Sequence, residues 1–172
     1  MTRFYATLIL ASCLLLSAAQ GTPQVVEDQF YRIKNVRSKK VLSVEDKGKL
    51  EGAQIVQVVT AGTELQQWKF VKTGDYYKIV NRKTGMALNV QNESRDGGTP
   101  IIQWDAKAPN ENQQWTLEKK GDNYAIKARH SGLVLDVADG SKDRKAPLVQ
   151  NPFKETDNEN QLFEFVPVKG KK

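Results

Sequence analysis

Apolar and polar residues alternate with a period of two in short runs along the chain. The runs "YKIV", "ALNV" and "WTL" show this alternation, which is typical of strands with one buried face. Turn-forming groups such as "KTG", "RDGG" and "KKGDN" separate the runs. No stretch of ten or more residues has the spacing of an amphipathic helix. The pattern predicts an all-β domain built from about twelve short strands.

The alternating runs recur three times, at intervals of 46 and 47 residues. The three rows begin with "FYRIKNVRSKKVLSVED" at position 30, "YYKIVNRKTGMALNVQN" at 76 and "NYAIKARHSGLVLDVAD" at 123, and they close with "QQWKF", "QQWTL" and "QLFEF". Because the edges of a lone strand leave backbone groups unpaired, we expect three copies of a four-strand unit to close on one another as a barrel. The positions that align are Ile33, Ile79 and Ile126; Leu42, Leu88 and Leu135; Val44, Val90 and Val137; and Gln57, Gln103 and Gln150.

Three repeats of this length, each closing with Gln-x-aromatic, resemble the ricin-type β-trefoil lectin family. The resemblance covers residues 29–168 and implies a β-trefoil with pseudo-threefold symmetry. The lobes would span about 29–73, 74–120 and 121–168. A three-bladed propeller is the alternative, but it falls below the usual range of four to eight blades. Many family members carry a cysteine in the second strand of the repeat, where this chain has Val41, Ala87 and Val134.

The aromatic residues of the closing groups are candidates for the centre of the barrel. Each would fill the interior from one lobe and bury about 150–250 Å². The glutamine beside each ring can fix loop backbone, because its amide both donates and accepts hydrogen bonds. We therefore assign a structural role to Gln66, Trp68, Trp115 and Phe163.

The resemblance also locates candidate sugar-binding residues. Ricin-type lectins use an Asp after the second strand, a stacking aromatic residue some way further on, and an Asn beside the closing Gln. Such a set suits a sugar, which has adjacent hydroxyls and one apolar ring face. In the third lobe Phe153 is a substitute for the ring, because the stacking position itself holds an asparagine. The carbohydrate-binding candidates of this lobe are Asp136, Asn151, Asn160 and Gln161.

The second lobe has the ring but lacks the carboxylate. Its carbohydrate-binding candidates are Asn89, Trp104, Asn112 and Gln113. The first lobe lacks acceptor, ring and Asn, so we predict that it is structural only; its corresponding residues are Ser43, Val58, Leu65 and Gln66. Each incomplete site is expected to bind weakly, near millimolar or about 4 kcal/mol. Several such sites on one rigid barrel can still act together on a polymer or a cell surface.

Each candidate also has a purely structural interpretation, which stays open at this point. Trp104 can pack on the flank of the barrel. Asn89 and Asp136 stand next to turns, where Asn and Asp commonly hydrogen-bond local backbone. Gln113 and Gln161 can serve mainly to fix loops.

The first nineteen residues are predicted to be a secretory signal peptide, with a positive start, an apolar run over 4–16 and the small residues "SAA" before the cleavage site. An alternative is a lipoprotein signal ending at Cys13 in "LASC". Cleavage after Ala19 would remove the only cysteine. The remaining residues, roughly 150 of them, can form a core without disulfides. Residues 20–28 are predicted to be a short leader and 169–172 a basic tail.

Other chemistry has little support in the sequence. The one histidine, His130, lies in the turn-like "ARHSG" and is expected at the surface, without Cys or His companions for a metal. No Ser-His-Asp set, thiol nucleophile or phosphate-binding glycine loop is evident. We expect no catalytic residue, cofactor, metal, nucleic-acid partner or transmembrane segment, and a monomer. "NES" makes Asn92 a glycosylation candidate in a eukaryotic secretory pathway.

The sequence thus predicts a secreted, non-catalytic carbohydrate-binding protein that recognises a sugar or a glycoconjugate. The alternative is a β-trefoil that binds protein, such as a protease inhibitor, through its exposed loops. Without residues 1–19 the chain has 25 basic and 20 acidic residues, mostly scattered apart from "RSKK" and the terminal "KGKK". Weak binding to polyanions is therefore a further expectation.

Overall fold

The computed structural model describes residues 25–26, 28–45, 51–107 and 109–169. The predicted signal peptide, most of the leader and the end of the basic tail lie outside these residues. Within the described ranges, no helix has the length and apolar character that crossing a membrane requires.

Twelve strands make up the described part of the chain, and their number and grouping confirm the predicted all-β fold with four strands in each repeat. The strands are β1 (Tyr31–Asn35), β2 (Val41–Val44), β3 (Ile55–Val58), β4 (Trp68–Thr73), β5 (Tyr76–Asn81), β6 (Ala87–Val90), β7 (Thr99–Trp104), β8 (Trp115–Lys120), β9 (Asn123–Ala128), β10 (Val134–Val137), β11 (Leu148–Asn151) and β12 (Phe163–Pro167). The 3-10 helices are η1 (Glu64–Gln66), η2 (Gln91–Glu93), η3 (Glu111–Gln113), η4 (Ala138–Gly140) and η5 (Glu159–Gln161).

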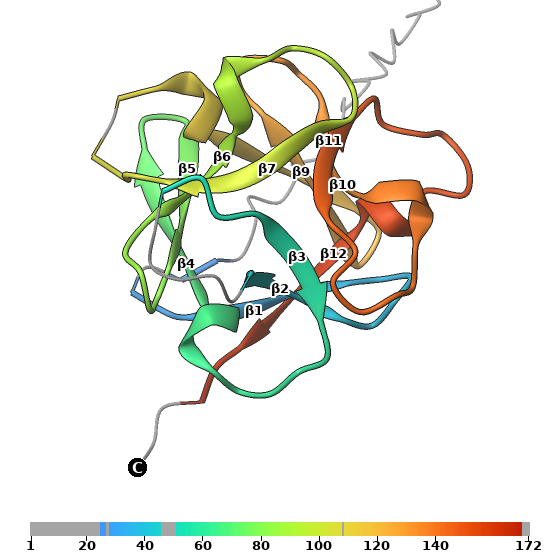
Figure 1. Ribbon diagram of the computed structural model, residues 1–172, viewed down its shortest axis with the longest axis horizontal. Helices are drawn as coiled ribbons and strands as arrows, with labels where there is room; N and C mark the ends of the chain where they lie inside the picture. The colour runs from blue at the N-terminus through green and yellow to red at the C-terminus, as the bar shows by residue number, and fades with distance from the viewer. Residues whose placement is uncertain (1–24, 27, 46–50, 108, 170–172) are drawn as a thin grey trace, which may run out of the picture.

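Six of the strands form a closed antiparallel ring, in the order β1, β4, β5, β8, β9, β12 and back to β1. The remaining strands pair as three hairpins, β2–β3, β6–β7 and β10–β11. These hairpins surround the centre of the view in Figure 1. A barrel capped by three equivalent hairpins is the β-trefoil that the repeat predicted.

The core consists of the apolar positions that recur in the repeat. Trp68, Trp115 and Phe163 are all fully buried, as are the aligned isoleucines and leucines. The indole Nε1 of Trp68 donates a hydrogen bond to the carbonyl oxygen of Leu42 at 3.1 Å, and Trp115 does the same to Leu88 at 3.2 Å. Phe163 has no such donor, so the third lobe lacks this bond.

A second set of aligned residues links neighbouring lobes. The side chains of Gln57, Gln103 and Gln150 are fully buried. In the first lobe, the Nε2 of Gln57 donates to two carbonyl oxygens of the loop after β10, at positions 141 and 143, both at 2.9 Å. In the third lobe, the Nε2 of Gln150 donates to the carbonyl oxygens at positions 94 and 96 in the loop after β6, again at 2.9 Å. Each of these amides therefore fixes a loop of another lobe.

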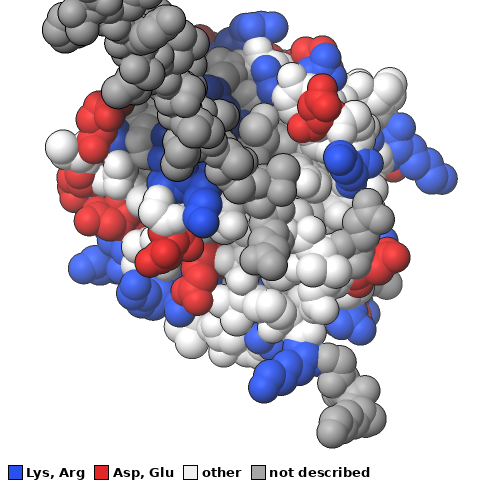
Figure 2. All heavy atoms as spheres, turned by 180° about the vertical axis from the view of Figure 1, so that it is seen from behind, with Lys and Arg blue, Asp and Glu red and all other residues white. Residues whose placement is uncertain are grey.

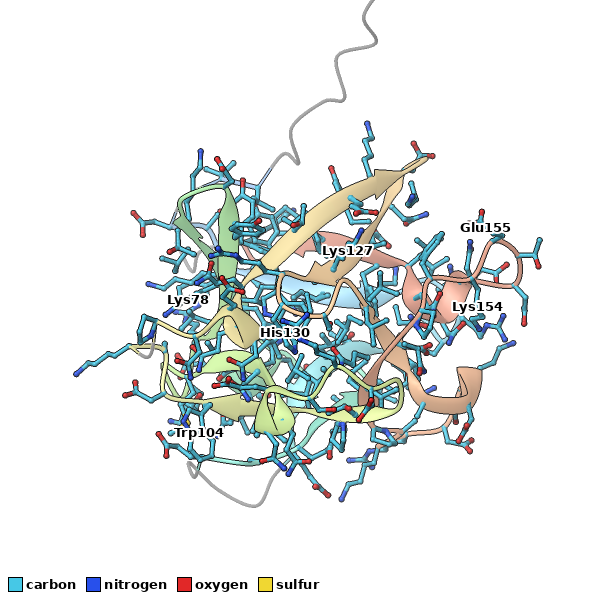
Figure 3. The ribbon with its side chains drawn as sticks, turned by 90° about the horizontal axis from the view of Figure 1, so that it is seen from above. Lys78, Trp104, Lys127, His130, Lys154 and Glu155 are labelled. Carbon is cyan, nitrogen blue, oxygen red and sulfur yellow. The ribbon has the colours of Figure 1, made fainter. Side chains whose placement is uncertain are left out.

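His130 corrects an expectation from the sequence. It is buried, with 9% of its surface exposed, and its Nε2 lies 2.8 Å from the carbonyl oxygen of Ser94. The same carbonyl oxygen accepts the hydrogen bond from Gln150. The loop that covers the ring belongs to the preceding repeat, and Figure 3 shows His130 well inside the outline of the molecule. The turn that carries His130 in the third repeat therefore contacts the loop after β6 in the second.

Candidate functional site

Each lobe has a hollow beside its hairpin. The hollows measure about 600 Å³ in the first lobe, 260 Å³ in the second and 440 Å³ in the third. Each is bordered by the second strand of the repeat and by the 3-10 helix that precedes the closing aromatic residue. Trp104 in the second hollow and Lys154 in the third lie on opposite sides of the molecule in Figure 3. The lobes therefore offer separate sites of different composition.

In the third lobe, Asp136 is the centre of a network of amides. Its side chain is 3% exposed. Its Oδ2 accepts hydrogen bonds from the Nε2 of Gln161 at 2.8 Å and from the Nδ2 of Asn151 at 3.1 Å, and its Oδ1 accepts from the Nδ2 of Asn160. A carboxylate has about four acceptor positions. The structure thus brings all four third-lobe candidates together, and three of the acceptor positions of Asp136 are occupied.

Asn151 occupies the position where the resemblance implies a ring, and it acts differently. It donates to Asp136, while its Oδ1 accepts a hydrogen bond from the backbone nitrogen of Gly98 at 2.9 Å. A Cβ atom added at the neighbouring Gly97 would come within 3.1 Å of the same oxygen. Asn151 therefore connects the third-lobe hollow to the tight turn between β6 and β7.

Phe153 does not replace the missing ring. The ammonium group of Lys120 lies over it, 4.8 Å from the ring centroid, and Phe153 is not among the residues that line the hollow. The interpretation of Phe153 as a stacking residue was wrong, because after Pro152 its ring packs beside the β8–β9 hairpin. The third hollow has a carboxylate but no aromatic wall.

Two cationic side chains in the third hollow were missed from the sequence. Arg37, from the first repeat, donates to Asp157 and, at 3.0 Å, to Glu159. Its hydrogen bond to Glu159 is the main cause that raises the pKa of Arg37. The pKa of Glu159 is lowered, first by a hydrogen bond from its own backbone and then by Arg37. The Nζ of Lys154 donates to the Oδ1 of Asn160 at 2.8 Å.

In the second lobe, three of the four candidates line the hollow. Asn89 and Asn112 are 4% and 3% exposed, whereas Trp104 is 39% exposed. The Nδ2 of Asn112 donates to the Oδ1 of Asn89 at 3.0 Å and to the carbonyl oxygen of Val90 at 2.9 Å. The result is a half-exposed indole close to a pair of buried amides. Asn92, Glu93, Ile102 and Asn110 also line the hollow, and none of them was selected from the sequence as a sugar-binding residue.

Gln113, the fourth candidate of this lobe, lies outside the hollow lining. Its Nε2 donates to the carbonyl oxygen of Asp105 at 3.0 Å. In the third lobe the backbone nitrogen of Lys154 donates to the Oε1 of Gln161 at 2.8 Å. The equivalent backbone nitrogen in the second lobe, that of Lys107, donates to the Oδ1 of Asp105 at 3.0 Å and makes no such bond to Gln113. The Oε1 of Gln113 and the Oδ1 of Asn112 consequently have no hydrogen-bond partner among the described residues. The second lobe is therefore less completely bonded than the third.

The fold and these sites can be compared with known proteins. The family described as "ricin-type beta-trefoil lectin domain-like" matches residues 20–104 and 111–171. This chain belongs to that family. None of the curated proteins is significantly similar to this ricin-type domain.

Solved structures with the same trefoil include designed and natural proteins. The designed threefold-symmetric protein ThreeFoil is 35% identical, with 81% of this ricin-type chain and 99% of that chain covered and a TM-score of 0.77. The exo-β-1,3-galactanase 1,3Gal43A from Clostridium thermocellum is also 35% identical, with 84% and 31% covered and a TM-score of 0.78. The ricin B-like lectin of Macrolepiota procera, solved with lactose, is 20% identical, with 83% and 98% covered and a TM-score of 0.72.

Charge on the surface of this ricin-type domain is mixed. On the face shown in Figure 2, the Lys and Arg side chains of the described residues are interspersed with Asp and Glu. Ion pairs such as Lys34 with Glu164 at 3.1 Å and Arg129 with Glu111 at 2.8 Å also join opposite charges. The fields of interspersed charges largely cancel at a distance.

Proposed function

We propose that this protein is a secreted, non-catalytic lectin that binds carbohydrate through the hollows of its second and third lobes. The observation that carries the proposal is in the second lobe, where the half-exposed indole of Trp104 borders the same hollow as Asn89 and Asn112. An indole can cover the apolar face of a sugar ring. The amides can exchange hydrogen bonds with adjacent hydroxyls.

The third-lobe hollow supports the proposal with different chemistry. Asp136 is held by three amide donors, and a carboxylate has about four acceptor positions. A hydrogen bond to a carboxylate is roughly twice as strong as a neutral one, which offsets part of the loss of a stacking ring. Each site alone is expected to bind weakly, with a dissociation constant of about 1 mM.

Similar structures indicate which sugars should be tested first. Their descriptions name lactose for the Macrolepiota procera lectin and GalNAc for the earthworm R-type lectin C-half. The galactanase matches over only 31% of its length, so its activity is not transferred to this chain. We therefore propose galactose-containing glycans as the first ligand class to examine. Residues 1–19, which support secretion, lie outside the described residues.

The test is a titration of the ¹⁵N-labelled protein with lactose, in which the amide chemical shifts report binding. Trp104→Ala should abolish the shifts around the second hollow and leave those around the third, and Asp136→Ala should do the reverse. Val71→Ala is the matched control, because Val71 is also 39% exposed but lines none of the hollows described above. If both site variants titrate like the wild type, the two assigned hollows are not the binding sites.

A further inference from the structure

The hollow of the first lobe differs from the other two in chemistry. It is the largest of the three, at about 600 Å³, within the range of small-molecule sites. Aliphatic side chains replace the sugar-binding candidates: Val58 stands where the other lobes have Trp104 and Asn151, and Leu65 stands where they have an asparagine. Val56 and Val59 extend this surface, and Val59 is 61% exposed.

The polar groups at the floor of this hollow are already engaged with backbone. The hydroxyl of Ser43 donates to the carbonyl oxygen of Val44 at 3.0 Å. The Oε1 of Gln66 accepts from the backbone nitrogen of Ala61 at 2.8 Å, and its Nε2 donates to the carbonyl oxygen of Val59 at 3.2 Å. Ser43 and Gln66 therefore offer a sugar few free partners, whereas an apolar ligand needs none. The hydroxyl-bearing Thr60 and Thr63 also line the hollow.

Two cations border the hollow from another lobe. Arg144 and Lys145 belong to the loop after β10 and line the first-lobe hollow. Gln57 holds this loop in place: its carbonyl oxygen accepts from the backbone nitrogen of Lys145 at 2.8 Å, and its own backbone nitrogen donates to Ala146 at 3.0 Å. A bridge between Val56 and Pro147 adds to the attachment. The backbone of the loop is therefore fixed beside the hollow, and both cationic side chains are exposed there.

Among the described residues, no side chain pairs directly with either cation. Within the described ranges, the side chains of Arg144 and Lys145 form no hydrogen bond or ion pair. Among the described residues that line the hollow, Glu45 is the one acidic residue. An aliphatic cleft with two free cations on one side is complementary to a ligand that is apolar along its body and negatively charged at one end.

The backbone of Lys145 adopts a conformation that favours glycine. Its φ angle is +69°, and the equivalent positions in the other repeats are Gly52 at +82° and Gly98 at +79°. Glycine tolerates this left-handed conformation, whereas a residue with a side chain is strained there. The third repeat places a lysine at a position that favours glycine, next to the first-lobe hollow. A conformational outlier of this kind motivates a functional hypothesis.

We propose that the first-lobe hollow binds a small amphipathic anion, namely an aliphatic carboxylate. Its hydrocarbon chain lies against Val56, Val58 and Leu65, and its carboxylate faces Arg144 and Lys145. The site is independent of the sugar sites in the other two lobes. The first lobe, which the sequence analysis regarded as structural only, is then a binding site of another class.

The test uses octanoate as the probe, titrated into the ¹⁵N-labelled chain below its micelle concentration. We expect saturable shifts at the amides of residues 43, 58 and 61, and none from octylammonium, which has the same chain and the opposite charge. Octanol should bind more weakly by about threefold or more, since it lacks the charge. Equal binding of all three probes, or no saturable shift with octanoate, would overturn the proposal.

Two variants separate the role of the Lys145 ammonium group from the general effect of replacing a lysine by glycine. Lys145→Gly should weaken octanoate binding by about threefold and raise the melting temperature, because glycine suits the backbone there. Lys39→Gly is the matched control, since Lys39 also has a positive φ of 60°, is exposed and lines none of the hollows described above. Equal weakening by both changes contradicts a local site.

A third variant tests the apolar wall. Val58→Asn introduces the residue that the third lobe has at this position, and it should reduce octanoate binding without changing the response to lactose. Conversely, Trp104→Ala should leave octanoate binding intact, so failure of this proposal and failure of the lectin proposal are distinguishable. If dilution alone reproduces the shifts at residues 43, 58 and 61, the hollow is filled by a second copy of the chain, and the proposed ligand is wrong.

Discussion

Replacing Asp136 by asparagine changes one atom at the centre of the third-lobe hollow. The carboxylate is 3% exposed and accepts hydrogen bonds from the side-chain amides of Asn151, Asn160 and Gln161. All three partners present N–H groups to it. An asparagine retains one oxygen, but its own NH₂ group must then face at least one of these donors. The variant therefore loses charge-assisted hydrogen bonds and leaves a buried donor unpaired.

The size of the effect follows from this geometry. Hydrogen bonds to a charged group contribute about 1.5–3 kcal/mol each, and neutral ones about 0.5–1.5 kcal/mol. The variant loses the free energy of one such bond, and its other bonds become weaker. Part of this loss is offset, because an uncharged side chain costs less free energy to bury than a charged one. We expect Asp136→Asn to lower the free energy of unfolding by about 2 kcal/mol, which for a domain of this size lowers the melting temperature by about 4–8 °C.

Urea denaturation followed by tryptophan fluorescence measures this change, because Trp68 and Trp115 are fully buried in the core. The matched control is Asn89→Asp in the second lobe, where the new carboxylate has one amide donor, Asn112. The control should therefore give no gain in stability. An Asp136→Asn protein within about 0.5 kcal/mol of the wild type would refute the argument that the carboxylate organises this hollow.

Three further predictions concern the frame around the sites. Trp115→Phe removes the hydrogen bond to the carbonyl oxygen of Leu88 and leaves a small cavity, so calorimetry should show a loss of about 2–4 kcal/mol; an unchanged melting temperature would contradict it. Lys39→Gly relieves a positive φ angle and should raise the free energy of unfolding by about 0.5–1 kcal/mol, measured in urea; a decrease would show that the lysine is not strained. The pKa of Glu159 is lowered, first by a hydrogen bond from its own backbone and then by Arg37. Its carboxylate therefore stays ionised and bonded to Arg37 at and above the usual pKa of a glutamate, and the bond is lost as the pH falls through the lower folded-state pKa. Carboxyl NMR shifts of Glu159 that titrate at or above pH 4.5 would contradict this.

The sequence was sufficient to predict the trefoil because the fold repeats the same contacts three times. The aligned isoleucines, leucines and closing aromatic residues are the fully buried residues of the core. Because equivalent positions are buried in every repeat, they keep the same type of residue. The interval of 46 and 47 residues can therefore be recognised in the sequence. Candidate residues for the hollows came from the family resemblance applied to this alignment, and they include Asp136 and the three amides that bond to it.

Contacts between lobes were not predictable in this way. Arg37 belongs to the first repeat but borders the third-lobe hollow, while Arg144 and Lys145 belong to the third repeat but border the first. His130 is buried by a loop of the second lobe. An alignment compares positions within repeats, and it contains no information about which loop of one lobe covers which strand of another. That information arises only when the ring of strands closes.

The three lobes also show how one frame can support different chemistries. Positions 43, 89 and 136 hold Ser, Asn and Asp, and all three side chains are buried, at 6%, 4% and 3% exposure. Their hydrogen-bond partners lie within the lobe, and none of the three belongs to the apolar cluster around the closing aromatic residues. A substitution at this position therefore alters a hollow and leaves the core contacts in place.

Closure of the ring is nevertheless a condition for every hollow. The turn that carries Gly98 binds Asn151 in the next lobe, and the loop that carries Lys145 is fixed by Gln57 in another. A single repeat would lack these contacts and could not position the side chains that border its own site. The lobes can therefore diverge in the side chains that border their hollows, one residue at a time, but these hollows are complete only in the closed trefoil.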